Sequence, residues 1–250
     1  MLQRIVIPAW LIVTALAVSH GRASVFGPDF IGHYVEASLG SPSGVPGPLG
    51  GLTFLAGDPN TLLIGGNANA PTGAIYAIGL VRDAGGHITN FTGSASWDAS
   101  APQIDGGLAY GPGGVLYFTQ YNTNQIGQIK PGQTVPARTD GINGVGTTYS
   151  DSVGSLTFVP AGFAGAGGLK VLTYQGANFG SIPLSPHGDG TFDLGVGTTT
   201  ANLGTPFNPE GMAYVKGSNY GFAVDSLLVS EYTSGKIAAY DLDGSGSPLP

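Results

Sequence analysis

Four acidic residues are the strongest candidates for chemistry in this sequence. Glu210 and Glu231 are two of only three glutamates in the chain, and Asp105 and Asp151 precede two apolar stretches nearer its middle. Carboxylates that converge on one point form an oxygen-rich site suited to calcium or magnesium, and such an ion can polarise a lactone or an ester. This hypothesis requires a fold that brings the four residues together.

A repeated phrase indicates which elements hold these residues. The motifs GLTF, GLAY, SLTF and GMAY begin at Gly51, Gly107, Ser155 and Gly211. Their spacing of roughly fifty residues is within the range of repeats that build propeller blades. After each opening strand come a second apolar strand, a Gly-containing turn and a third strand, and three of the four units continue with a polar turn. Such turns favour a hairpin into an outer fourth strand.

The repeat predicts an all-β protein, a β-propeller of four-stranded antiparallel blades around a central channel, with about four to five blades visible. A β-sandwich is the alternative fold, but it does not explain an ordered repeat of this length. The third strands carry isoleucines at matched positions, Ile75, Ile126, Ile182 and Ile237. Because the repeat gives them the same side-chain parity, we expect all four to be buried between blades.

The propeller fold determines where the acidic residues lie. The innermost strand begins, and the second strand ends, on the same face of the disc. Glu210, Glu231, Asp105 and Asp151 are therefore expected at one mouth of the channel, where they could bind Ca²⁺. The other units offer Gln120, Gln175, and Gly66 or Asn67 at the position of Glu231. The competing interpretation is that these carboxylates end loops and are solvated, as acidic groups at a channel mouth often are.

Other possible sites in the sequence have weaker support. The stretch from Asp241 to Gly246 fits the first half of a calcium loop, but turns occupy the same place in two other units, so we interpret it as a turn. The histidines lie far apart in sequence, and the glycine-rich stretches join strands rather than open a helix, which argues against a phosphate site. Several aromatic residues fall on strand positions and are interpreted as inter-blade packing: Tyr110, Tyr117, Phe158, Tyr174 and Tyr214.

Composition narrows the class of protein. The chain of 250 residues has 42% hydrophobic residues, 44 glycines and only 9% charged residues, which suits short strands joined by tight turns. A formal net charge of −7 argues against nucleic acid or an anionic membrane as a partner, because little positive charge is available to neutralise phosphates. The absence of cysteine means that disulfides do not stabilise the domain.

The first residues are typical of a secretory signal peptide. An apolar run from Ile5 to Val18 follows one arginine, and Gly21-Arg22-Ala23 fits a cleavage pattern. The run is too short to cross about 30 Å of hydrocarbon. We therefore expect a signal peptide over residues 1–23, a propeller domain over 24–250 with no membrane span in the mature chain, and a secreted or periplasmic bacterial protein.

Two stretches carry a resemblance to a known family. PEGMAY...LLVSEYTSGKIAAYDLDG and GGLAYGPGGVLYFTQYNTNQIGQI resemble the NHL and SMP-30/gluconolactonase-like β-propellers, from Gly51 to the C-terminus. The resemblance implies a fold more than an activity. SMP-30-like enzymes also use asparagine and aspartate ligands in other blades, which have no residue-by-residue match here. A looser similarity links the chain to exported bacterial propellers of the PEP-CTERM type, whose sorting tag this sequence lacks.

The last unit stops just after its third strand, at DLDGSGSPLP. Either residues 30–38 supply the missing outer strand by circular closure, or the chain is a truncated version of a longer propeller, which we favour because an exposed edge strand is unfavourable. Two functions remain. The first is a non-enzymatic exported binding or scaffold protein for an unknown protein or polysaccharide ligand. The alternative is a divalent-metal-dependent lactonase or related hydrolase.

Overall fold

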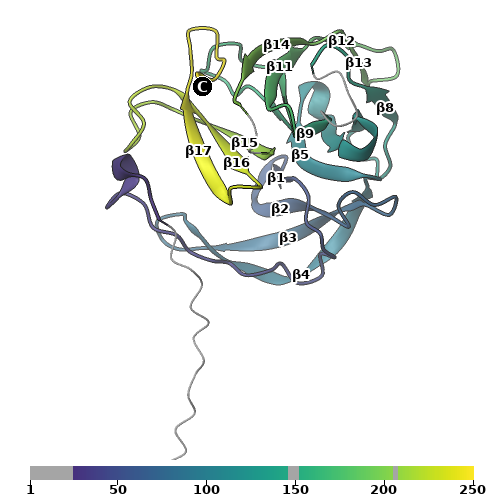
Figure 1. Cartoon of the computed structure of the whole chain (residues 1–250). Helices are drawn as coiled ribbons and strands as arrows, with labels where there is room; N and C mark the ends of the chain where they lie inside the picture. Colours follow the sequence, from purple (N-terminus) through teal and green to yellow (C-terminus); the bar gives the residue numbers. More distant parts are fainter. Residues whose placement is uncertain (1–24, 146–151, 205–207) are drawn as a thin grey trace, which may run out of the picture.

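The computed structural model describes residues 25–145, 152–204 and 208–250. The expected signal peptide and Asp151 lie outside the described residues. The described chain forms four antiparallel sheets arranged around an axis as a four-bladed β-propeller (Figure 1). The predicted all-β fold is confirmed, and the helices of the described residues are single 3-10 turns such as η1 (Pro28–Phe30), η2 (Pro112–Gly114) and η3 (Tyr121–Thr123).

The first two blades each contain four strands in sequential order. Blade 1 contains β1 (Leu52–Leu55), β2 (Asp58–Gly66), β3 (Ala74–Arg82) and β4 (Ile88–Ser100). Blade 2 contains β5 (Ile104–Tyr110), β6 (Leu116–Gln120), β7 (Gln125–Ile129) and β8 (Arg138–Gly141). The first strand of each blade lies nearest the axis, and the last lies at the rim.

The third and fourth blades depart from this pattern in different ways. Blade 3 contains β9 (Val153–Phe158), β10 (Leu169–Thr173), β11 (Asn178–Ile182) and β14 (Thr198–Asn202), with the small hairpin β12 (Leu184–Pro186) and β13 (Phe192–Leu194) inserted before its outer strand. Blade 4 is a sheet of three strands, β15 (Pro209–Val215), β16 (Ser226–Glu231) and β17 (Lys236–Asp241). The four innermost strands begin close to the predicted blade starts.

Apolar clusters join consecutive blades. The cluster between blades 2 and 3 includes Tyr117, Ile126, Leu156 and Val171, and Tyr117 packs edge-on against Phe158 at 5.0 Å between ring centroids. Similar clusters join blade 1 to blade 2 and blade 3 to blade 4. Burial of these side chains between sheets is the main stabilising contribution that the repeat makes.

Glycines allow the innermost strands to approach one another at the axis. A Cβ on Gly106 of β5 would collide with the carbonyl oxygens of Glu210 and Gly154, which belong to blade 4 and to blade 3. On the other side of β5, the N–H of Gly51 donates to the carbonyl of Asp105 at 2.7 Å. Two glycines of the opening motifs are confined in the same way: a Cβ on Gly51 would lie 2.7 Å from the carbonyl oxygen of Gly106, and one on Gly107 would lie 2.5 Å from the backbone nitrogen of Leu156. Close backbone contact therefore requires glycine at these positions.

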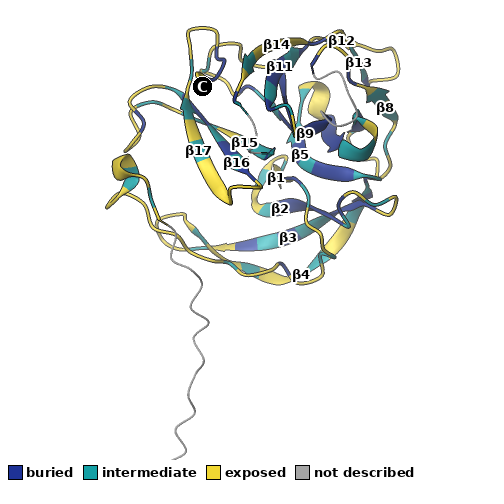
Figure 2. Cartoon of the chain, viewed as in Figure 1, coloured by how far each residue is buried: buried dark blue, intermediate teal, exposed yellow. Residues whose placement is uncertain are grey.

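Two of the four matched isoleucines behave differently from the prediction. Ile75 and Ile126 are fully buried and face the following blade. Ile182 is buried, but it faces blade 2 instead of blade 4. The residue of blade 3 that holds the matched position is Phe179, three residues earlier, which packs toward blade 4. Side chains separated by an odd number of residues along a strand lie on opposite faces. Ile237 is 73% exposed, because its face of blade 4 lies against an open seam instead of another blade (Figure 2).

Residues 30–38 do not add a strand to blade 4; the described segment is a 3-10 turn followed by a turn and irregular backbone. Instead, Phe30 lies 5.1 Å from Phe222 between ring centroids, and the Tyr34 hydroxyl donates to the carbonyl of Tyr220 at 2.8 Å. Phe222 and Tyr220 belong to the loop between β15 and β16. This N-terminal segment therefore forms a clasp between the chain leading into blade 1 and a loop of blade 4.

Candidate functional site

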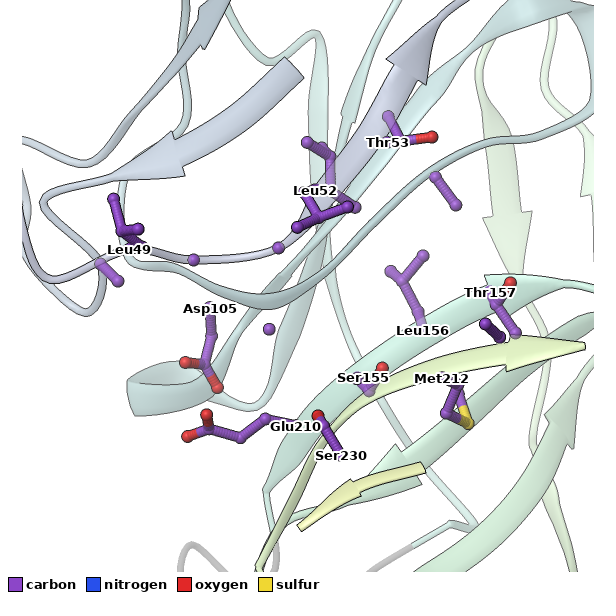
Figure 3. Close-up of a pocket in the computed structure, with 18 of the residues that line it drawn as sticks. Leu49, Leu52, Thr53, Asp105, Ser155, Leu156, Thr157, Glu210, Met212 and Ser230 are labelled. Carbon is purple, nitrogen blue, oxygen red and sulfur yellow. The ribbon is translucent and has the colours of Figure 1, made fainter. Parts of the chain in front are cut away.

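A cavity of about 1060 Å³ runs along the propeller axis. All four innermost strands line it, and Figure 3 shows side chains of β1, β5, β9 and β15 gathered around it. Leu52 and Phe54 of blade 1 and Leu228 and Ile237 of blade 4 also line it, so the cavity continues into the open seam between these two blades. Its lining includes Asp105 near the start of β5 and Phe54 near the end of β1.

Asp105 and Glu210 meet in this cavity. Asp105 is the second residue of β5, Glu210 is the second residue of β15, and Figure 3 shows their carboxyl groups pointing toward each other. Asp105 is only 5% exposed, and the side-chain amide of Asn69 donates to its Oδ1 at 3.1 Å. Two of the four residues predicted for one mouth are therefore brought together.

Burial changes the acidity of this pair. Burial raises the pKa of Asp105 to about 6, against weaker lowering by hydrogen bonds from Asn69 and the Gly106 backbone. The pKa of Glu210 rises to about 7, first because of burial and then because of the charge on Asp105. Ionising both carboxyl groups is therefore unfavourable without a positive partner.

Glu231 does not join the pair. Its Oε2 accepts from the Ser234 hydroxyl at 2.8 Å, its Oε1 accepts from the Tyr240 hydroxyl at 3.0 Å, and the residue is only 5% exposed. Burial, and then the hydrogen bond to Glu231 and the charge on that carboxylate, raises the pKa of Tyr240 to about 12. Because successive residues of a strand face opposite sides, the end of β16 points Glu231 into its own hairpin and the next residue toward the cavity.

The same arrangement holds in blades 2 and 3, where the structure also corrects one matched position. Gln120 ends β6, is buried, and donates to the carbonyl of Pro102 at 2.8 Å. The residue at this place in blade 3 is Thr173, which ends β10, rather than the predicted Gln175. Thr173 is also buried, and its hydroxyl accepts from the N–H of Asn178 at 3.0 Å. The predicted polar ring at the strand ends is therefore turned away from the axis.

A row of tyrosines lines the cavity instead. Tyr121, Tyr174 and Tyr232 each follow the last residue of the second strand of their blade, and all three line the cavity. Their ring centroids are 5.1 Å apart for Tyr121 and Tyr174 and 6.4 Å apart for Tyr174 and Tyr232. Burial, and then the charge on Glu210, raises the pKa of Tyr174, which places this ring beside the carboxyl pair.

Sequence reasoning missed this row. Tyr174 was interpreted as inter-blade packing, and Tyr121 and Tyr232 were not singled out. The signal was a tyrosine one residue beyond the second strand in three consecutive units, in QY, TY and EY. The packing interpretation does hold for Tyr117 with Phe158, whose rings meet between blades 2 and 3.

A buried hydroxyl lines the same cavity. Ser155 of β9 is 1% exposed, and its Oγ has no hydrogen-bond partner within the described part of the chain. Figure 3 shows Ser155 on the cavity wall close to Glu210 and Ser230. A buried polar atom without a partner costs about 1 to 3 kcal/mol, so it is usually kept for a reason.

The lining carries negative but no positive charge. Of the residues that line the cavity, Asp105 and Glu210 are the acids, and none is lysine, arginine or histidine. Within residues 25–145, 152–204 and 208–250, no group of three or more His, Cys, Asp or Glu side chains is placed to hold a metal ion. Of the six to eight oxygen ligands that calcium prefers, the acidic side chains of the lining could supply those of two carboxylates, Asp105 and Glu210.

The turn after β17 has the structure expected for it. Asp243 Oδ1 accepts from the backbone N–H groups of Ser245 and Ser247 at 2.8 and 2.9 Å. These bonds close a compact turn around one carboxylate.

Comparisons with known proteins find distant structural similarity alone. No protein-family model matches the chain, and curated proteins give no match either. Similar solved structures include an auxiliary nutrient binding protein from Bacteroides ovatus, 14% identical over 80% of this chain and 48% of that one, with a TM-score of 0.49. A candidate 6-phosphogluconolactonase from Bacteroides uniformis is 13% identical over 83% of this chain and 57% of that one, with a TM-score of 0.44.

A third similar structure is the periplasmic gluconolactonase of Pseudomonas aeruginosa, 15% identical over 78% of this chain and 66% of that one, with a TM-score of 0.42. The chain thus spans about half to two thirds of the length of these three proteins. These neighbours include proteins named as a gluconolactonase and a candidate 6-phosphogluconolactonase, which is the kind of protein that the sequence resembles. In the part of the chain that the structure describes, no helix has the length and apolar character needed to cross a bilayer.

Proposed function

We propose that the protein is an exported, non-enzymatic binding protein whose axial cavity takes a segment of a polysaccharide. The observation that carries this proposal is the tyrosine row and the two carboxyl groups in the lining of one cavity. Aromatic rings present apolar faces to a sugar ring, and carboxyl and hydroxyl groups orient its hydroxyls.

The charge of the lining limits the ligand. An anionic sugar, such as a phosphorylated or uronic one, would bring negative charge next to Asp105 and Glu210 without any cationic side chain in the lining. Burying such a charge is strongly unfavourable. The ligand is therefore a neutral or cationic segment.

Binding to an oligosaccharide array, followed by titration calorimetry of the best neutral or cationic oligomer, tests this function. Replacing Tyr174 by alanine removes one ring of the row and should weaken binding by roughly 2 kcal/mol, the loss typical of a central aromatic contact. Trp97→Ala is the matched control, because Trp97 is 53% exposed on the outer strand β4 and does not line the cavity. Equal losses in both variants, or binding only to a protein ligand, would contradict the saccharide proposal.

A metal-dependent lactonase or related hydrolase is the second candidate. The facing pair of Asp105 and Glu210 supports it, because a divalent cation would relieve their repulsion. Thermal melts with calcium and with a chelator, combined with a lactone hydrolysis assay, separate the two functions. For the binding protein we expect no hydrolysis; calcium-dependent hydrolysis that is lost in Glu210→Gln would assign the hydrolase.

Export remains a proposal that rests on residues 1–23. Their apolar run and cleavage pattern indicate a signal peptide. Mass spectrometry of the protein recovered outside the cytoplasm should show a mature chain that begins near Ser24. Intact Met1 in the exported fraction would refute the cleavage.

A further inference from the structure

We infer that the axial cavity selects a ligand carrying a protonated amino group and seats that group between Asp105 and Glu210, which makes an amino sugar the preferred occupant. This inference deepens the proposed function and rests on it. A glucosamine unit has both groups that the cavity could bind: a sugar ring that can pack on the tyrosines and an ammonium group that can donate to the carboxyl pair.

The first support is the geometry of the pair. Asp105 and Glu210 reach the cavity from the opening residues of two different innermost strands, β5 and β15, and their carboxyl groups point toward the same space (Figure 3). Asn69 fixes Asp105 by donating to its Oδ1, and this carboxyl is nine-tenths buried. An ammonium group between two carboxylates donates to both, so it replaces their repulsion with two charge-assisted hydrogen bonds.

Ser155 is the second and independent support. Its hydroxyl is buried, lines the cavity and has no partner within the described residues. It lies on β9, the innermost strand of blade 3, which contacts both β5 and β15 at the axis. A ligand with several donors and acceptors at this point gives the Ser155 hydroxyl the hydrogen bond that the described protein groups leave unmade.

The titratable groups around Asp105 and Glu210 favour a cationic ligand. The titratable residues in the lining are Asp105, Glu210, Tyr121, Tyr174 and Tyr232. None of them carries positive charge at neutral pH. The counter-charge must therefore come from the ligand, and the faces of nearby aromatic rings also attract cations.

An ammonium group fits the described oxygen acceptors better than a bare divalent ion does. Ammonium has three donors, and two carboxylates with one hydroxyl satisfy them. Calcium needs six to eight oxygens, and no third acidic side chain joins Asp105 and Glu210 within the described residues. The two occupants nevertheless compete for the same carboxylates, so the test must include calcium as an arm.

Two oligosaccharides of equal length and linkage test the inference, because they differ in the acetyl group that converts each charged amine into a neutral amide. The probes are tetramers of glucosamine and of N-acetylglucosamine, titrated into the full protein by calorimetry at pH 7, above the Asp105 pKa of about 6, where Asp105 is mostly ionised. We expect the glucosamine tetramer to bind at least about tenfold more tightly, as one desolvated charge pair typically produces. The difference should disappear in the double variant Asp105→Asn, Glu210→Gln.

A second double variant controls for long-range attraction by the acidic protein. Asp29→Asn, Glu36→Gln removes the same formal charge from two exposed positions outside the cavity. It should keep the preference for glucosamine within about twofold, because exposed charges contribute little at physiological salt. Circular dichroism and a thermal melt confirm that each variant is folded before its binding is interpreted.

Each outcome decides between distinct conclusions. Equal binding of the two tetramers would overturn the inference and leave the saccharide-binding function standing. Failure of both tetramers and of every other oligosaccharide would overturn the proposed function and the inference with it. If calcium alone binds with the same dependence on Asp105 and Glu210, and the glucosamine tetramer does not bind, the pair is a metal site and the inference is wrong.

Discussion

The interface between blades 2 and 3 and the seam between blades 4 and 1 occupy corresponding places around the axis, but only the first is closed. Ile126 on β7 is fully buried among residues of blades 2 and 3. Ile237 holds the matched register position on β17, one pair inward from the strand end, and is 73% exposed. A repeat unit therefore determines which side chain faces the next blade, while the presence of that blade determines whether the side chain is buried.

The open seam also explains the shape of the candidate site. In the closed interfaces, side chains from two sheets fill the space between blades. At the seam, apolar residues of β1 and β17 line the axial cavity instead. A ligand of the proposed kind that enters along the seam would reach the carboxyl pair and the tyrosine row in the same cavity.

The largest expected effect tests the difference between the two isoleucines. Ile126→Ala should lower the free energy of unfolding by about 4 kcal/mol, because it leaves a cavity in a close-packed cluster. Ile237→Ala removes the same atoms from a solvent-exposed position and should change stability by no more than about 0.5 kcal/mol. Denaturation in urea measures both. A loss in Ile237→Ala similar to that in Ile126→Ala would show that the seam is closed in solution.

A glycine at the axis tests how blade 4 is held despite the seam. Gly106→Ala should cost about 3 kcal/mol, because its Cβ would collide with backbone oxygens of Glu210 and Gly154 and push blades 3 and 4 away from blade 2. Gly141→Ala is the matched control on the outer strand β8, where a Cβ meets nothing within 4 Å. That variant should be neutral or gain about 0.5 kcal/mol from a less flexible unfolded chain. Equal stability of the two variants would contradict the close packing at the axis.

These contrasts show what the sequence could and could not predict. The propeller and its strand order follow from the repeat, because turn residues and apolar strands recur in the same order in each unit. The convergence of Asp105 and Glu210 followed from the same topology. The exposure of Ile237 did not, since one unit contains no information about whether another sheet packs on it.

The remaining errors arose from side-chain parity. Ile182 was assigned the position that Phe179 holds three residues earlier, and an odd shift along a strand reverses the face. Gln175 was assigned the position of Thr173, but it lies two residues beyond the end of β10. Glu231 was expected at the mouth because it ends a strand, but strand alternation directs it into its own hairpin. Tyr232, the next residue, is the one whose side chain lines the cavity.

A smaller effect concerns the carboxyl pair and depends on pH. Folding raises the pKa of Asp105 to about 6, so the folded protein holds this proton more tightly than the unfolded chain does. The stability cost of ionising Asp105 is absent below the unfolded pKa of about 4, grows as the pH rises, and is complete above the folded value. Asp105→Asn should therefore stabilise the protein by about 2 kcal/mol at pH 8 and leave it nearly unchanged at pH 4.

Thermal or urea unfolding across pH 4 to 8 measures this difference, with Asp58→Asn as the control. Hydrogen bonds from the Thr61 side chain and the Asn60 backbone lower the pKa of Asp58, so removing its charge should not stabilise the protein at high pH. A constant gain from Asp105→Asn at every pH would mean that its carboxyl group is not penalised in the folded state. The Asp105→Asn change should also lower the pKa of Glu210, because it removes the neighbouring charge.

The smallest expected effect concerns the clasp that reaches from the N-terminal segment to blade 4. Phe30→Ala should cost only about 1 kcal/mol, the energy of an aromatic pair beyond simple burial, because Phe30 packs mainly on Phe222 and Tyr34. Ile31→Ala, at a residue 64% exposed, should have no measurable effect. Hydrogen exchange should accelerate at residues 28–34 and 216–222 in Phe30→Ala and stay unchanged around Ile126, because the clasp joins the two sides of the seam without belonging to the closed core. If Phe30→Ala instead accelerates exchange throughout blades 2 and 3, the N-terminal segment supports the whole ring, and the distinction between a closed interface and an open seam fails.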